Sequence, residues 1–237
     1  MVLSLRETLG MVGSHEWRKK GVHIKALDAN IHAHYGVYSP IRGEYLDLVH
    51  GAPLTDVKVA WDIGTGTGVI AAILIQRGVE QVVATDDNPR ALLCAAENFE
   101  RLRVEKRVDL VGASLFPEGT ADLIVCNPPW VPAKANTPIE RAVYDPKSRM
   151  LRGFLNGVAE HLNANGEAWL VMSDLAEQIG LRGPSDLQNW ISQSGLKLIE
   201  KHDTVPTHTK SSDQSDPLHE ARSKEVTSLY RLEAVRA

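Results

Sequence analysis

A glycine-rich run between two apolar segments most constrains how this chain can fold. The run reads Asp62-Ile63-Gly64-Thr65-Gly66-Thr67-Gly68. Glycine tolerates a positive φ, so the backbone can turn tightly there and approach a ligand where a Cβ would collide. Val57–Asp62 before it has the length of a buried strand, and Val69–Gln76 after it has the periodicity of a helix. This order predicts the first unit of a parallel α/β sheet.

The rest of the chain continues the alternation of strand-length apolar runs with helical segments that is typical of βαβ units. Further strands are expected at Gln81–Thr85, Arg107–Val111, Ala121–Cys126, Ala168–Met172, Leu196–Ile199 and Thr227–Leu232. Further helices are expected from Pro89, from Leu151 to a stop at Asn165-Gly166, and over Asp186–Ser194. The last two strands have no helix between them, so we expect an antiparallel pair joined by a polar loop over 207–224. The prediction is an α/β fold with a doubly wound, mostly parallel seven-stranded sheet.

Residues before Val57 do not follow this alternation. Val22–Tyr38 alternates apolar and polar residues as a β-hairpin does, and Glu44–His50 has the pattern of a short helix. We therefore expect a lead-in segment over 1–50 and a main domain over 51–237.

Composition narrows the class of protein. The 237 residues are 43% hydrophobic and 24% charged, which is enough for one large core, and the net charge of -4 gives no overall basic field for non-specific nucleic-acid binding. The two cysteines, Cys94 and Cys126, lie in apolar segments and are expected to be core residues rather than a disulfide. With neither a signal peptide nor an apolar run of membrane-spanning length evident, we expect a cytoplasmic protein without a membrane partner.

The glycine run departs from the two common nucleotide-binding loops. A dinucleotide site requires glycine at position 69, where this chain has valine, and a triphosphate-binding loop requires Lys followed by Ser or Thr. A nicotinamide-dependent oxidoreductase is therefore disfavoured. Asp86 ends the expected second strand about two dozen residues after Asp62, where a carboxylate can accept hydrogen bonds from both hydroxyls of a ribose. Asp87 is an alternative for that role, or a cap of the next helix.

A second motif, Asn127-Pro128-Pro129-Trp130, follows the expected fourth strand and so lies at the same edge of the sheet. The Asn127 amide oxygen and the Pro128 carbonyl are hydrogen-bond acceptors, the prolines fix the loop, and Trp130 offers a flat face for stacking. Two acceptors suit a nitrogen whose lone pair is delocalised, because they hold both N–H groups and turn the nitrogen toward an electrophile. A rigid proline turn beside a core tryptophan is the alternative interpretation of this motif alone.

Together the two motifs resemble those of class I methyltransferases that use S-adenosylmethionine, and most closely the small-domain type that includes release-factor glutamine and ribosomal RNA enzymes. Tyr35–Pro40, followed by Glu44, is similar to the segment that closes over the cofactor in that family. Trp130 replaces the more usual Tyr or Phe. The resemblance covers residues 35–237.

The resemblance implies S-adenosylmethionine as the cofactor and assigns roles to individual residues. The implied cofactor-binding residues are Asp62 near the amino group, Gly64, Thr65, Gly66 and Gly68 in the loop, Asp86 on the ribose, Ser114 at the adenine, and Asn127. Ser114 stands where relatives often have Asp before a Leu-Phe pair, so a hydroxyl would accept the bond from the adenine amine. The implied catalytic residues are Asn127, Pro128 and Trp130.

The sequence thus predicts an S-adenosylmethionine-dependent N-methyltransferase that acts on a planar nitrogen. An exocyclic base amine of rRNA or tRNA and a glutamine amide of a protein such as a release factor both stay open as substrates, as does the oligomeric state. A non-catalytic cofactor-binding or scaffolding module of a methylation complex is the alternative. Arg149 and Arg152 are candidate contacts to an RNA backbone or an acidic protein surface. Such a transfer needs no metal, and His32 and His34 are expected at the surface.

Overall fold

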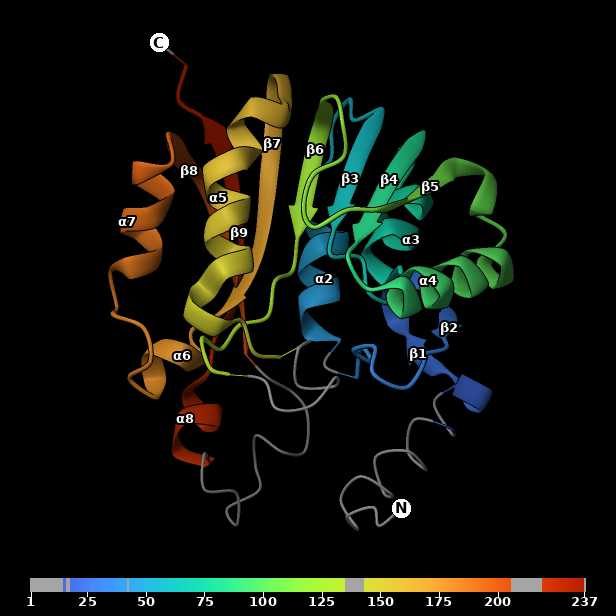
Figure 1. Cartoon of the computed structure of the whole chain (residues 1–237), viewed down its shortest axis with the longest axis horizontal. Coiled ribbons are helices and arrows are strands. Elements are labelled where there is room, and N and C mark those ends of the chain that lie inside the picture. Colours follow the sequence, from blue (N-terminus) through green and yellow to red (C-terminus); the bar gives the residue numbers. More distant parts are fainter. Residues whose placement is uncertain (1–14, 16–17, 42, 135–142, 206–218, 237) are drawn as a thin grey trace.

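The computed structural model describes residues 15, 18–41, 43–134, 143–205 and 219–236. At its centre is a seven-stranded sheet of order β5-β4-β3-β6-β7-β9-β8 (Figure 1). The strands are β3 (Val59–Ile63), β4 (Gln81–Asp86), β5 (Val108–Gly112), β6 (Ala121–Cys126), β7 (Leu162–Ser173), β8 (Leu196–Thr204) and β9 (Thr227–Ala234). The first five pair in parallel, and β9 runs antiparallel to both β7 and β8. The predicted mostly parallel sheet with its antiparallel end is confirmed.

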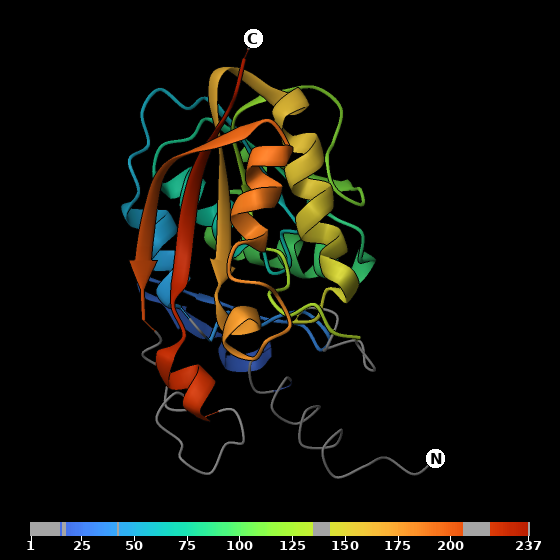
Figure 2. The same cartoon turned by 90° about the vertical axis from the view of Figure 1, so that its left-hand side faces the viewer.

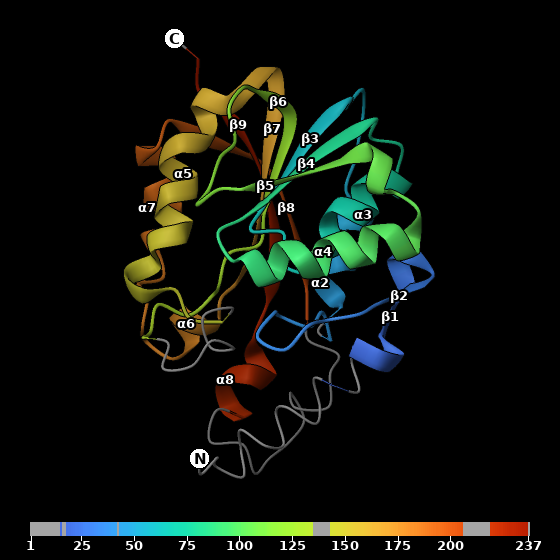
Figure 3. The same ribbon diagram turned by 45° about the vertical axis from the view of Figure 1, so that its right-hand side comes forward.

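Helices cover both faces of this sheet, which makes it doubly wound. Helices α2 (Glu44–Gly51), α3 (Val69–Gln76) and α4 (Pro89–Leu102) pack on one face (Figure 3). Helices α5 (Arg149–His161) and α7 (Asp186–Gln193) pack on the other (Figure 2). Successive strand side chains point to opposite faces, so β3 supplies Ala60 to one apolar core and Trp61 to the other.

The N-terminal segment forms a separate two-stranded antiparallel sheet of β1 (Val22–Ile24) and β2 (Ala29–Ile31), joined by a 3₁₀ turn, η1 (Lys25–Leu27). This hairpin is shorter than the one predicted over 22–38. The chain leaves β2 after Ile31 because its backbone bonds to α4 instead: the N–H of His32 donates to Asn98 Oδ1 at 2.9 Å. The helix predicted at 44–50 is confirmed as α2.

Two expectations about turns and loops are wrong or incomplete. Helix α5 ends at His161, and Asn165-Gly166, expected to stop it, lies inside β7. There Asn165 has a φ of 64°, and the pairing of β6 with β7 shifts register, so the two residues form an irregularity of a strand. The polar loop expected over 207–224 ends in a short helix, α8 (His219–Lys224). The part at 207–218 lies outside the described residues.

The two cysteines confirm one prediction, and a buried histidine beside α4 corrects another. Cys94 and Cys126 are buried and unpaired, as predicted. His34 is only 5% exposed, so its expected surface position is wrong. Its burial is possible because Glu97 on α4 supplies a partner, with His34 Nε2 2.9 Å from Glu97 Oε2.

In the described part of the chain, no helix combines the length and the apolar character needed to cross a membrane.

Candidate cofactor and active site

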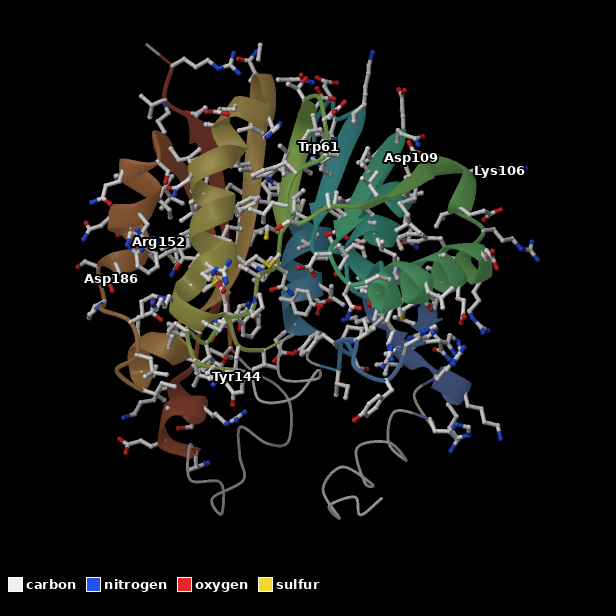
Figure 4. All side chains as sticks on the ribbon, in the orientation of Figure 1. Trp61, Lys106, Asp109, Tyr144, Arg152 and Asp186 are labelled. Atoms are coloured by element: carbon white, nitrogen blue, oxygen red, sulfur yellow. The ribbon has the colours of Figure 1, made fainter. Side chains whose placement is uncertain are left out.

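A cleft of about 1490 Å³ opens at the carboxyl edge of the sheet, where β3, β4 and β6 end. Open α/β sheets bind ligands at this edge, at the strand where the order reverses. That strand is β3, because the chain continues from β3 outward to β4 and β5 and then returns to place β6 on the other side of β3. Tyr144, one of the residues that line the cleft, lies below this edge in Figure 4.

Most of the residues singled out in the sequence line this cleft. They are Gly64, Thr65, Gly66, Asp86 and Ser114 from the predicted cofactor set, and Asn127, Pro128 and Trp130 from the second motif. Asp62 and Gly68 are buried and are not among the lining residues. The fold therefore brings two motifs that are about sixty residues apart to one cleft.

The three glycines of the loop all have positive φ, of 72°, 57° and 82° for Gly64, Gly66 and Gly68. The three positions nonetheless differ in what surrounds them. A Cβ on Gly64 would lie 2.5 Å from Met150 Cε, and one on Gly68 would lie 2.6 Å from the ring of Phe99. A Cβ on Gly66 would come no closer than 4.0 Å to its nearest neighbouring atom, the Gly64 carbonyl oxygen. At Gly66 the missing side chain thus leaves room in the cleft, whereas at Gly68 it leaves room for the protein core.

Asp62 organises the glycine loop from beneath. Its side chain is buried, and its Oδ2 accepts hydrogen bonds from the Thr65 hydroxyl at 2.7 Å and from the Ala71 N–H at 3.1 Å. Burial raises the pKa of Asp62 to about 6, although these two hydrogen bonds oppose the shift. The carboxyl group therefore ties the loop to the first turns of α3.

Asp86 ends β4 and lines the cleft with its carboxylate. Oδ2 accepts from the Gly66 N–H at 3.0 Å, and Oδ1 accepts from the Asn88 N–H at 2.9 Å. Burial is the main cause that raises the pKa of Asp86, and nearby Asp87 adds to it. Each carboxylate oxygen retains a further lone pair. Asp87 does not cap α4, because the Asn88 side chain does so by accepting from the Arg90 N–H.

The second motif is held by its own side chains and by α2. The Trp130 indole N–H donates to Asn127 Oδ1 at 2.9 Å. Since an indole N–H can only donate, this bond fixes the amide of Asn127 with its oxygen toward the ring. The ring of Trp130 packs edge-on against Tyr45, with centroids 6.4 Å apart and planes at 90°. Burial raises the pKa of Tyr45 well above its usual range, and a side-chain hydrogen bond with Asn127 partly opposes that shift.

Two residues that hold the motif were missed from the sequence, Tyr45 and Arg182. Arg182 Nη2 donates to the backbone carbonyl oxygen of Trp130 at 2.9 Å. Helical periodicity places Tyr45 on the buried side of α2, but it does not show which loop that side meets. An arginine in a polar loop gives no local signal of burial at all.

The two candidate substrate contacts, Arg149 and Arg152, are separated by the fold. Arg149 is exposed and lines the cleft. Arg152 lies one turn further along α5 and places its guanidinium 5.3 Å from the ring centroid of Trp190 on α7, on the side visible in Figure 4. Among the residues with described positions, no group of three or more His, Cys, Asp or Glu side chains gathers into a metal site.

Comparison with solved structures defines the class of fold as that of the Rossmann-like methyltransferases. A methyltransferase from Pyrococcus furiosus superposes with a TM-score of 0.60 at 17% identity and covers 97% of this chain and 98% of its own. A geranyl diphosphate methyltransferase in complex with SAM superposes with a TM-score of 0.59 at 14% identity, over 82% of this chain and 85% of its own.

Residues 28–179 match the family model of the methyltransferase small domain, and the chain belongs to that family. A release factor glutamine methyltransferase of Mycobacterium leprae (strain TN) is 31% identical over 180 residues, which cover 68% of this chain and 57% of that protein. A ribosomal protein L11 methyltransferase of Vibrio cholerae serotype O1 (strain M66-2) is 29% identical over 143 residues, 60% of this chain and 45% of that protein. The chain therefore spans about half the length of these curated relatives.

Family membership confirms the resemblance found in the sequence and, with it, S-adenosylmethionine as the cofactor. The cleft fits this molecule in two respects. The backbone at Gly66 borders open space, and the Asp86 carboxylate beside it retains acceptor capacity for hydroxyl groups.

Proposed function

We propose that this chain is an S-adenosylmethionine-dependent N-methyltransferase that acts on a planar nitrogen. The observation that carries the proposal is the placement of Asn127 in the same cleft as Gly66 and Asp86. A group that accepts hydrogen bonds from a substrate amine thus lies beside the groups suited to the cofactor.

On the cofactor side, Asp86 would accept the ribose hydroxyls and the exposed Ser114 hydroxyl would accept from the adenine amine. Gly64, Thr65 and Gly66 would border the methionine part of the cofactor. Asp62 and Gly68 would act indirectly, by holding the shape of the loop from the buried side. When bound, the cofactor supplies a methyl group on a positively charged sulfur.

On the substrate side, the residues provide two acceptors and one flat surface. Asn127 Oδ1 already accepts from Trp130, and its second lone pair would accept one N–H of the substrate. The Pro128 carbonyl would accept the other, and Trp130 would stack on the planar group. Holding both N–H groups fixes the direction of the nitrogen lone pair, which is the contribution that positioning makes to such a reaction. The motif contains no strong base, and the proposal requires none.

The substrate is either a base amine of rRNA or tRNA or a glutamine amide of a protein. The names of the relatives support a substrate connected with translation, since one refers to release factor glutamine and another to ribosomal protein L11. The exposed side chains of Arg149 and Lys134 in the cleft lining would favour an anionic surface next to the target nitrogen.

We further propose that residues 1–50 form a lead-in segment and that residues 51–237 form the methyltransferase domain. In support of the division, β1 and β2 form a sheet separate from the main one. In support of a role in the site, Tyr38 and Tyr45 line the cleft beside the second motif.

The test is to incubate the protein with S-adenosylmethionine labelled in the methyl group and with cell extract, and then to digest parallel samples with RNase or with protease. We expect labelled macromolecules, and the digestion that releases the label identifies the substrate class. Cofactor binding is measured separately by titration calorimetry. Binding without any transfer would support the scaffolding alternative, and the absence of binding would overturn the proposal at its first step.

A further inference from the structure

We propose that Arg182 is a positioning residue for the Asn127–Trp130 motif and that it orients the Asn127 amide through Trp130. This inference rests on the proposed function, because Asn127 is the residue that would hold the substrate nitrogen. Arg182 lies after α6 (Leu175–Gln178), in the loop that leads to α7.

The Arg182 side chain is almost completely buried, at 2% exposure. Its Nη2 donates to the Trp130 carbonyl oxygen at 2.9 Å, and its Nη1 donates to Glu177 Oε1 at 3.3 Å. In the described structure, Arg182 Nε and Glu177 Oε2 have no hydrogen-bond partner. A buried guanidinium is unfavourable unless its donors are paired. The shorter of its two bonds is made to the motif.

The ion pair alone does not account for this arrangement. An optimised Arg–carboxylate pair is bidentate, with two parallel bonds, whereas Arg182 and Glu177 share one long bond. Burial raises the pKa of Glu177, and Arg182 only partly offsets that shift. The guanidinium is therefore a weak partner for Glu177 and a good donor to Trp130.

The bond to Trp130 connects directly to the site. Arg182 donates to the backbone carbonyl of Trp130, and the indole N–H of the same Trp130 donates to Asn127 Oδ1 at 2.9 Å. On the following residue, the Val131 carbonyl accepts from the Asp145 N–H at 2.9 Å. The N–H of the peptide unit that carries the Trp130 carbonyl belongs to Val131 and donates to the Val143 carbonyl at 3.3 Å. Loss of Arg182 would therefore leave this peptide held on its N–H side only, and the indole of Trp130 would be less firmly placed. The orientation of Asn127 then depends on a residue that lies 55 positions later in the chain.

The test compares three variants and follows individual tryptophans. Arg182→Met combined with Glu177→Gln removes the donor without leaving an unpaired buried carboxylate. Glu177→Gln alone is the matched control, since it keeps the bond from Arg182 to Trp130. Arg231→Met removes a guanidinium elsewhere: Arg231 Nη2 donates to Glu167 Oε1 at 2.7 Å, and Glu167 Oε2 accepts from the Trp169 indole at 2.9 Å.

The first readout is the fluorine NMR spectrum of protein labelled with 5-fluorotryptophan, with signals assigned by Trp130→Phe and Trp169→Phe. The double variant should shift the Trp130 signal and leave the Trp169 signal in place. Arg231→Met should do the reverse, and Glu177→Gln should move neither. An unshifted Trp130 signal in the double variant would overturn the inference, whether or not the protein transfers methyl groups.

The second readout is the rate of label transfer from S-adenosylmethionine into extract macromolecules. The double variant should lose about tenfold or more of this rate, with a calorimetric Kd for S-adenosylmethionine within about twofold of wild type. Arg182→Lys keeps a positively charged hydrogen-bond donor, so it should retain part of the rate that the double variant loses. This variant carries the test if the double variant does not fold. Equal rate losses in the double variant and Arg231→Met would overturn the inference. If the wild-type protein transferred no methyl groups, the proposed function would be contradicted instead. The NMR result would still decide whether Arg182 positions Trp130.

Discussion

Gly66→Ala should mainly weaken cofactor binding, whereas Gly68→Ala should mainly lower stability. Both residues belong to one loop and have positive φ, 57° and 82°. The left-handed conformation costs an alanine about 1–2 kcal/mol in either place. At Gly66 nothing is added to this, because the nearest atom to the new Cβ is 4.0 Å away. At Gly68 the Cβ would lie 2.6 Å from the Phe99 ring and 3.3 Å from Ala95 Cβ, and such overpacking adds about 1–3 kcal/mol. Gly68→Ala should therefore be the less stable protein.

Cofactor affinity should follow the reverse order. The Cβ of Gly66→Ala projects into the cleft, so we expect the Kd for S-adenosylmethionine to rise by about tenfold or more, or about 1.4 kcal/mol. Gly68→Ala should stay within about threefold of wild type once the Kd is corrected for the folded fraction, since its Cβ faces the core. Urea denaturation gives the stabilities, and titration calorimetry gives the Kd. Wild-type affinity in folded Gly66→Ala would refute the reasoning, because the cofactor would then not occupy the space next to Gly66.

Three further predictions concern the cleft and the buried aspartate beneath its glycine loop. Asp86→Asn should fold but bind S-adenosylmethionine about tenfold more weakly in calorimetry, because a charged acceptor bonds hydroxyl groups more strongly than an amide; an unchanged Kd would contradict the ribose role. Burial raises the pKa of Asp62 to about 6 in the folded protein, against about 3.8 in the unfolded chain, so protonation of Asp62 favours folding. This contribution to the free energy of unfolding is fully present below pH 3.8 and is lost as the pH rises through 6. When the pH is raised from 4 to 7.5, the free energy of unfolding of Asp62→Asn, measured by urea denaturation, should increase relative to that of wild type by up to about 3 kcal/mol. Parallel pH profiles of the two proteins would contradict the raised pKa of Asp62. Trp130→Phe keeps an aromatic face but loses the N–H that orients Asn127, so the label-transfer rate should fall about tenfold at unchanged cofactor affinity; a wild-type rate would rule out this orienting role.

Local sequence patterns were sufficient for the features that depend on local physics. Helix α3 was predicted with its observed bounds, because a continuous apolar run follows directly on a glycine that starts the helix. Strand β6 was likewise predicted from end to end. Parallel strands place their carboxyl ends at one edge, so Gly66, Asp86 and Asn127 were expected in one cleft, and all three line it.

The features that were missed depend on residues far apart in the chain. Whether a glycine faces the cleft or the core is decided at Gly68 by Phe99 on another helix. Burial of His34 requires Glu97, and burial of Arg182 requires the carbonyl of Trp130. The stop signal at Asn165-Gly166 was assigned to the wrong element because a left-handed turn has the same sequence in a strand irregularity and at a helix end.

The most direct test of methyl transfer at this cleft is the label-transfer rate of Asn127→Ala, measured against wild type with both proteins saturated in S-adenosylmethionine as judged by calorimetry. Loss of the acceptor should lower the rate by about a hundredfold while a saturable cofactor site remains. A rate equal to that of wild type would contradict the assignment of the chemistry to Asn127.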